Sequence, residues 1–461
     1  MAAVDTASEA DWRHLERSVS GRVLRPGAAG FQDASAPFNK RFPHGGPAGV
    51  VSVASVADVQ RAVRWARATG TPIVPRGGGH SYAGHSVNDG LVVDVRALSA
   101  VTADGSAGRV TAAGGASMAA LYAAIEPEQI AFALGNGASV GIAGLTLGGG
   151  SAATSRSFGL TADALLSTTL VTADGELVTC DAEHHPDLFW ACRGGGGGNF
   201  GINVSFTYRA FPVADCATCL LLWDGADAPK VFAVLQDVMR HAPDELSIRL
   251  GASTADGAHI TVSAIGLHLG PARELRELLD PVLAVARPVR EDIADRTFWQ
   301  AQQYLLHETS AGAFAVRTNF AAEPLPPEAV AEALAHLHRW PGGTNPDGGG
   351  LALFGWGGAV NKVAPDATAF PHRDAHFLVN MDTSWGEQDG PAAVPAHLRW
   401  LGELREIVAP HVLPGAYVNF ADPDLADWRT AYYGANYPRL VEVKRRYDPD
   451  ALFTFAQAVG S

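Results

Sequence analysis

The segment Arg76-Gly-Gly-Gly-His80-Ser-Tyr82 places a histidine directly after a run of glycines. Glycine lets the main chain approach a ligand closely, so His80 can reach a molecule bound at this loop. A neutral imidazole nitrogen is a nucleophile that can form a covalent bond to an electrophilic group. Two more glycine-rich segments follow, at 135–150 and 193–201. Three such loops predict one large ligand that lies against backbone, with free N–H groups for phosphates.

A serine hydrolase is the alternative from a different class. The pattern Gly137-x-Ser139-x-Gly141 matches the nucleophile elbow of those enzymes, with Ser139 as the nucleophile. That elbow must lead from a strand into a helix. Here Gly144 and the glycines at 148–150 would fall in the helix, and each would destabilise it by about 1 kcal/mol relative to alanine.

The amino-acid composition excludes several classes of binding partner. The 461 residues include 34 Lys and Arg against 48 Asp and Glu, for a formal net charge of −14. Nucleic acids and anionic membranes require clustered basic residues, so we expect neither as a partner. The four cysteines show no zinc-ligand spacing and are too few for a disulfide framework. With no visible signal peptide or membrane span, we expect a cytoplasmic protein without a metal site.

Regular elements must hold these loops in place. A helix is expected over 55–70, with Ser55 and Asp58 as a capping box and Gly70 as its stop. The first half also predicts strands at 71–75, 90–94, 110–113 and 202–206 and a helix at 118–125. After about residue 211 we expect strands at 246–251, 259–269, 351–354 and 376–380 and helices at 272–286 and 327–337. This second part predicts an α+β domain with a mostly antiparallel sheet.

The histidine loop, extended to Pro75-Arg76-Gly-Gly-Gly79-His80-Ser-Tyr82-Ala-Gly84, resembles the berberine bridge enzyme-like flavoprotein oxidases, which are of the vanillyl-alcohol oxidase type. Near the C-terminus, Tyr417-Val-Asn419 resembles the Tyr-x-Asn motif of that family. The segments 431–440 and 444–449 resemble its closing region. The resemblance covers nearly the whole chain, and several motifs in the same order make it specific.

The resemblance implies an α+β fold with a two-part, PCMH-type FAD-binding domain. Residues 1–210 and the returning C-terminal segment 415–461 would form that domain. Residues 211–414 would form a substrate domain with a mostly antiparallel sheet backed by helices. The change of pattern near residue 211 and the aromatic-rich tail agree with this division.

FAD is the cofactor that the resemblance implies, with His80 as the residue bonded to the flavin 8α-methyl group. Gly137 stands where many relatives have a second linking cysteine, so we expect a single covalent link. Val140 matches the position that controls oxygen access, where a small residue accompanies oxidase behaviour. The residues expected to bind FAD are Arg76, Gly77, Gly78, Gly79, His80, Ser81, His85, Gly137, Ser139, Val140, Gly141, Gly144, Gly148, Gly149, Ile202 and Asn419.

The same resemblance makes Tyr417 the expected catalytic base, with Asn419 to orient it. An unperturbed tyrosine titrates near 10. Tyr417 therefore needs a cationic neighbour or a polarised hydrogen bond to act at neutral pH, and Lys362, Arg373 and Arg317 are the candidate cations. The substrate contacts expected from the middle domain are Lys362, Arg373 and Trp356.

The resulting hypothesis is an FAD-dependent oxidase of a small organic molecule. Its substrate would be an alcohol, an amine or a compound with an activated C–H bond, as in natural-product tailoring. Hydride would pass to flavin N5, and O2 would reoxidise the flavin and give hydrogen peroxide. An oligosaccharide or sugar-lactol oxidase of the same fold is the alternative within this class.

Overall fold

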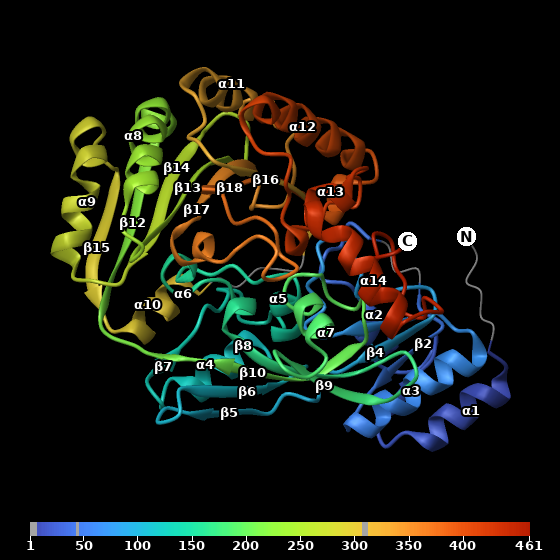
Figure 1. Ribbon diagram of the computed structural model, residues 1–461. Helices are drawn as coiled ribbons and strands as arrows, with labels where there is room; N and C mark the ends of the chain where they lie inside the picture. Colours follow the sequence, from blue (N-terminus) through green and yellow to red (C-terminus); the bar gives the residue numbers. More distant parts are fainter. Residues whose placement is uncertain (1–6, 43–45, 307–311) are drawn as a thin grey trace.

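The computed structural model describes residues 7–42, 46–306 and 312–461. The chain forms an α+β fold with two bodies (Figure 1). The lower body comes mainly from the N-terminal half and contains two sheets of moderate size. The upper body is built around one large antiparallel sheet. The mixed α+β class expected from the sequence is confirmed.

The first sheet has the strand order β1-β2-β4-β3. Its strands are β1 (Arg22–Leu24), β2 (Gly49–Ser52), β3 (Ile73–Arg76) and β4 (Leu91–Asp94). β4 pairs in parallel with β2 and β3, and it is buried along its whole length. The helices α1 (Glu9–Ser18) and α3 (Val56–Thr69) share a core with the sheet. The histidine loop begins where the parallel strand β3 ends, the edge at which ligands bind in such sheets.

Helix α3 begins and ends as expected, with one difference. Ser55 accepts the backbone N–H of Asp58, and Gly70 ends the helix with a φ of 68°. The Asp58 carboxylate does not complete the expected capping box. It accepts the N–H groups of Ser20 and Ala54 at 2.8 and 2.9 Å, and that of Gly21 at 3.0 Å. The buried carboxylate therefore joins α3 to the segment that leads into β1.

The second sheet is antiparallel, with the order β5-β6-β10-β8-β9. Its strands are β5 (Val101–Asp104), β6 (Arg109–Ala113), β8 (Leu165–Val171), β9 (Leu177–Asp181) and β10 (Ile202–Arg209). The helices α4 (Met118–Ile125), α5 (Ile142–Leu147) and α7 (Pro186–Ala191) contribute to its core. The central strand β10 starts directly after the third glycine loop, so the sheet fixes one end of that loop.

The third sheet has seven strands in the order β15-β12-β14-β13-β17-β18-β16. They are β12 (Cys216–Asp224), β13 (Leu246–Thr254), β14 (Thr261–His268), β15 (Arg290–Arg296), β16 (Ala313–Ala321), β17 (Gly349–Gly355) and β18 (Phe377–Trp385). The helices α8 (Ala228–His241), α9 (Ala272–Val285), α11 (Pro327–Leu337) and α12 (Ala393–Val408) cover its outer face (Figure 1). Its other face is turned toward the lower body.

The C-terminal helices α13 (Trp428–Tyr433) and α14 (Tyr437–Tyr447) return to the lower body, where α14 lies against α7 (Figure 1). The buried side chain of Lys444 fixes the position of this C-terminal segment on the lower body. Its Nζ donates to the carbonyl oxygens of Asn199 and Phe453 at 2.7 and 2.6 Å and to the Asp448 carboxylate at 2.6 Å. One ammonium group thus joins the third glycine loop to the tail.

Three features of the described residues bear on what the composition suggested. Within them, every helix is too short or too polar to cross a membrane. The cysteines Cys180, Cys192, Cys216 and Cys219 are all buried and unbridged. Residues 7–42, 46–306 and 312–461 also hold no cluster of side chains suited to a metal ion.

Candidate active site

A cavity of about 950 Å³ lies between the two bodies. All three glycine loops line it from below, and strands of the seven-stranded sheet line it from above, among them β13, β17 and β18. The C-terminal segment 417–421 and Phe455 complete the wall. The volume is at the upper end of the roughly 300–1,000 Å³ that is usual for small-molecule and cofactor sites.

The first two glycine loops touch through their backbones. A Cβ atom added at Gly78 would lie 2.3 Å from the backbone nitrogen of Gly141, and one at Gly141 would lie 2.4 Å from that of Gly78. Neither position can accept a side chain without separating the loops. The glycines therefore close the floor of the cavity by direct contact between main chains.

Unpaired amides line this floor. Within the described part of the chain, the N–H groups from Gly77 to Ser81 donate to no protein acceptor, and neither do those from Gly197 to Asn199. Backbone amides of buried loops are normally paired. Two rows of free donors at the cavity wall fit the phosphate oxygens of a dinucleotide.

His80 is held from two sides. Its Nε2 lies 3.0 Å from the Ser139 hydroxyl, and its ring stacks on Phe38 with centroids 4.0 Å apart. Burial and the neighbouring Arg76 cation lower the pKa of His80 to about 4. The imidazole is therefore neutral at pH 7. Nδ1 has no hydrogen-bond partner among the described residues, so it remains available as a nucleophile.

This geometry does not suit a serine hydrolase. Ser139 and His80 are within hydrogen-bond distance, but no described carboxylate contacts the His80 ring, and the charged group beside it is the Arg76 guanidinium. An acid that orients and stabilises the histidine is therefore absent from the described site. The segment before Ser139 is also irregular, because the preceding strand β7 covers only Ile130–Ala131.

Most of the expected cofactor residues line the cavity. They are Gly77, Gly78, Gly79, His80, Ser81, His85, Gly137, Val140, Gly141, Gly144, Ile202 and Asn419. Desolvation lowers the pKa of the partly buried His85 to about 4, and its Nε2 has no partner among the described residues. It is a free polar atom at the wall, as a cofactor site requires.

Four expected cofactor residues lie behind the wall. Arg76 is buried and donates to the Ala36 carbonyl, while its Nε and Nη1 have no partner among the described residues. Ser139 contacts His80 from outside the cavity lining. Gly148 and Gly149 give space to other side chains, because a Cβ at Gly148 would lie 2.1 Å from Asn419 Oδ1 and one at Gly149 would lie 3.0 Å from the Phe370 ring.

Gly137 faces Val140. A Cβ atom at Gly137 would lie 2.8 Å from Val140 Cγ2, and apart from the flanking residues only Val140 lies within 4 Å of it in the described part of the chain. Val140 therefore takes up space beside the point where the second linking residue would project. The local packing agrees with a single link, which stays a prediction.

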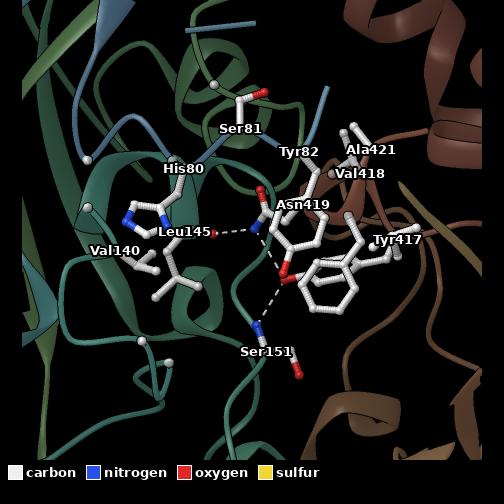
Figure 2. Close-up of a pocket in the computed structure, with 18 of the residues that line it drawn as sticks. His80, Ser81, Tyr82, Val140, Leu145, Ser151, Tyr417, Val418, Asn419 and Ala421 are labelled. Carbon is white, nitrogen blue, oxygen red and sulfur yellow. Dashed lines mark hydrogen bonds between the residues drawn. The ribbon is translucent and has the colours of Figure 1, made fainter. Parts of the chain in front are cut away.

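Tyr417 and Asn419 form one hydrogen-bonded unit with the second glycine region. The Tyr417 hydroxyl accepts the N–H groups of Gly150 and Ser151 at 3.1 and 3.0 Å, and Asn419 Nδ2 at 3.2 Å. Asn419 Nδ2 also donates to the Leu145 carbonyl at 2.9 Å (Figure 2). Burial raises the pKa of Tyr417 more than these three donors lower it. The hydroxyl is protonated at pH 7 and can donate its proton to a bound molecule.

The cations expected beside Tyr417 lie elsewhere, which corrects the sequence prediction. Lys362 is exposed and pairs with Asp244 at 2.6 Å. Arg373 is buried and forms a two-point ion pair with Asp163 at 2.7 and 2.8 Å. Arg317 pairs with Asp422 at 3.2 Å. Each charge is already neutralised, and none of these cations lines the cavity.

The prediction that Trp356 contacts the substrate is also wrong. Its side chain is 1% exposed and packs between Phe320, Phe370 and Tyr417. Its Nε1 donates to the His372 carbonyl at 3.3 Å. Trp356 therefore packs behind Tyr417 and does not reach the cavity. All three substrate contacts expected from the middle domain lie outside the cavity lining, namely Lys362, Arg373 and Trp356.

A group of polar residues on the seven-stranded sheet was not predicted from the sequence. Asn380 and Asp382 on β18 and Arg249 on β13 face the cavity, and Tyr82 lies near Asp382 and Tyr417. A signal was present, because the polar residues Asn380, Asp382 and Ser384 occupy every second position along β18. That period places them on one face of the strand, opposite the hydrophobic core.

Asp382 has the pKa best matched to base catalysis near neutrality. Burial raises its pKa to about 6, while Arg249 and a 2.8 Å hydrogen bond from Asn380 lower it and the more distant Asp347 raises it. A general base works best when its pKa lies near the operating pH. Asp382 therefore meets this condition, and Tyr417 does not.

The cavity fits FAD. The free amides of two loops suit its phosphates, the glycine contacts leave room for close approach, and the unpaired Nε2 of His85 lies at the wall without a polar partner among the described residues. When bound, a flavin supplies a two-electron acceptor. The residues Gly77 to Ser81, the loop 137–144 and the loop 197–199 would hold it.

The substitution Tyr417→Phe tests the hydrogen-bonded unit. We expect about 10- to 100-fold slower flavin reduction, since the proton on the hydroxyl and the acceptor for three N–H donors are lost. Stopped-flow absorbance at saturating substrate measures this rate. Tyr208→Phe is the matched control, because that buried tyrosine bonds to Thr146 outside the cavity. Equal rates in wild type and Tyr417→Phe would contradict the role.

Comparisons with known proteins agree with this geometry. A family model described as "FAD binding domain" matches residues 47–181, and one described as "Berberine and berberine like" matches residues 416–460. The FAD-linked oxidoreductase YgaK of Bacillus subtilis is 31% identical over 96% of this chain and 97% of its own length. The xylooligosaccharide oxidase of Thermothelomyces thermophilus is 31% identical over 93% of this chain and 89% of its own.

A solved structure agrees over the same length. BBE-like 1 of Physcomitrella patens superposes with a TM-score of 0.89 at 27% identity, covering 97% of this chain and 98% of that one. Both bodies of the fold are thus shared with this relative, including the sheet that carries Asp382.

Proposed function

The chain belongs to the berberine bridge enzyme-like family of FAD-linked oxidases, and from this membership we propose that it oxidises a small organic molecule with covalently bound FAD. The substrate class is an alcohol, an amine or a compound with an activated C–H bond. One observation carries the proposal. A single cavity joins a neutral histidine on a glycine loop to a partly buried carboxylate and a buried tyrosine on the facing wall.

The side chains divide the proton chemistry between them. Asp382 is placed to take the proton that leaves the substrate, because its pKa of about 6 makes it a carboxylate at pH 7. Tyr417 stays protonated and orients the substrate through its hydroxyl. Asn419 positions Tyr417 and ties it to the second glycine region. In this proposal Asp382 replaces Tyr417 as the catalytic base, and Tyr417 remains a residue that contacts the substrate.

The covalent link and the electron acceptor complete the proposal. His80 supports a single link, because its neutral ring has a free Nδ1 and Gly137 offers no thiol. Val140 lines the cavity directly before Gly141 of the Gly78–Gly141 contact and leaves more space than a larger residue would. O2 is the proposed acceptor, with hydrogen peroxide as the second product. A role in natural-product tailoring in the cytoplasm is part of the same proposal.

An oligosaccharide or sugar-lactol oxidase is the second candidate. Polar side chains favour it, because Asn345, Asp347 and Ser384 line the cavity together with Asn380 and Asp382. Carboxylates and amides are the usual partners of sugar hydroxyl groups. The relative named a xylooligosaccharide oxidase adds to this candidate.

The test is a screen for peroxide release. The purified holoenzyme is incubated in air with alcohols, amines, phenols and oligosaccharides, and hydrogen peroxide is measured with a peroxidase-coupled dye. We expect peroxide in proportion to substrate consumed, and no reaction without O2. A protein that lacks flavin, or a flavin that no compound reduces, would defeat the proposal.

A further inference from the structure

Arg249 is a cation without a partner on the wall of the substrate cavity. It lies on β13, whose Leu246, Ile248 and Leu250 belong to the core beneath the helices. Among the described residues, no carboxylate lies within 4.0 Å of its guanidinium, and no hydrogen-bond acceptor contacts it. By contrast, the buried arginines Arg156 and Arg373 donate to protein acceptors, the Leu246 carbonyl and the Asp163 carboxylate.

The surroundings hold this guanidinium in the cavity. A Cβ atom at Gly251 would lie 3.2 Å from Arg249 Nη1, so the absence of a side chain at Gly251 lets the arginine lie along the strand. The guanidinium carbon is 5.4 Å from the centroid of Phe354, which also lines the cavity. Stacking on an aromatic face orients the plane of the group and leaves its edges for hydrogen bonds.

Asp382 is near enough to influence Arg249 but does not neutralise it. Burial lowers the pKa of Arg249, and the Asp382 charge opposes that change. Asp382 accepts its hydrogen bond from Asn380 instead, at 2.8 Å. The wall thus has separate positive and negative groups, which is the arrangement for a substrate that carries a negative group at a distance from its reacting carbon.

We propose that Arg249 binds the carboxylate of an acidic substrate and so directs the oxidisable carbon toward Asp382 and Tyr417. This inference rests on the proposed function. A planar guanidinium binds a carboxylate through two parallel hydrogen bonds, a geometry that no neutral group matches. The aromatic side chains Phe314, Phe354, Phe420 and Tyr82 along the same cavity suit an apolar or aromatic body for that acid. The formal net charge of −14 repels anions in general, so the local cation decides their binding.

The experiment compares acids with their uncharged amides. Isothermal titration calorimetry of the holoenzyme measures binding of phenylacetate, phenylacetamide, hexanoate and hexanamide, and the absorbance of the flavin follows the same titrations. We expect each acid to bind at least about 10-fold tighter than its amide, as for hydrogen bonds to charged groups. In Arg249→Gln that preference is lost, and in Arg249→Lys part of it returns because the charge remains without the two-point geometry.

Controls distinguish the loss of carboxylate binding from a loss of folding and from a change in the overall charge of the protein. Arg399→Gln removes one exposed charge from α12, outside the cavity, and is expected to leave the preference unchanged. Circular dichroism and the flavin spectrum confirm that Arg249→Gln is folded. Its pH profile for turnover is expected to move to higher pH, since the positive charge that lowers the pKa of Asp382 is gone.

The outcomes distinguish the two proposals. Equal binding of acids and amides, binding of no carboxylate at all, or an unchanged preference in Arg249→Gln overturns the inference about Arg249. If the flavin is present and neutral compounds are oxidised with peroxide release, the proposed function stands even then. Absence of flavin or of any oxidation would defeat the proposed function instead.

Discussion

His80→Ala is expected to release all of the FAD from the protein on acid precipitation. Wild type should give a yellow pellet, and the variant a colourless pellet with a yellow supernatant. The reason is that the neutral imidazole of His80, with a free Nδ1, is the nucleophile placed at the first glycine loop. Absorbance of both fractions and flavin fluorescence on a denaturing gel measure the result.

The same variant should keep its fold and bind FAD reversibly. The free amides of Gly77 to Ser81 and Gly197 to Asn199 remain, so the phosphates keep their donors. Substitution should also lower the reduction potential of the flavin, because the bond to an electron-withdrawing imidazole is lost. His85→Ala is the matched control, since it removes a second cavity histidine with a similar pKa but should retain the covalent link. Colour that stays in the pellet of His80→Ala would contradict the assignment.

Asp382→Asn is expected to slow flavin reduction by about 10²- to 10⁴-fold, the range of a lost general base. Asparagine keeps the size and the contact with Asn380 but cannot accept a proton. Reduction measured anaerobically by stopped flow isolates this step from reoxidation. The bound FAD content should be unchanged, because Asp382 belongs to the seven-stranded sheet and not to the glycine loops.

The pH dependence gives an independent readout for Asp382. With a pKa of about 6, the carboxylate becomes protonated as the pH falls through 6, and kcat/KM should then fall about tenfold per pH unit. Above pH 7 the rate should be level. Asp382→Asn should abolish this acidic limb, and Asp292→Asn should preserve it because Asp292 pairs with Arg296 outside the cavity lining. A limb that persists in Asp382→Asn would assign the base elsewhere.

The elements that sequence predicted well are those with strong local signals. Helices α9 and α11 and strands β6, β13 and β14 lie within a few residues of their expected ranges. The strand β15 was missed because Arg290–Arg296 is mostly charged and lies at the edge of the sheet. An edge strand with partly exposed residues has no apolar alternation to reveal it. The strands β12 and β16 were also missed, and both pair only with segments distant in the chain.

The sequence by itself was sufficient to predict the cofactor and the loops expected to bind it. Glycine and histidine spacing around His80 and the Tyr417-Val-Asn419 motif are local features, and local features are readable along a chain. Only the tertiary structure showed which charged residues line the cavity where the substrate is proposed to bind. Lys362, Arg373 and Arg317 are neutralised by carboxylates far away in sequence. Arg249 and Asp382 are themselves far apart in sequence, and they reach one cavity because β17 pairs with the strands of both. Whether a charge is free or paired depends on such contacts, and only the folded chain sets them.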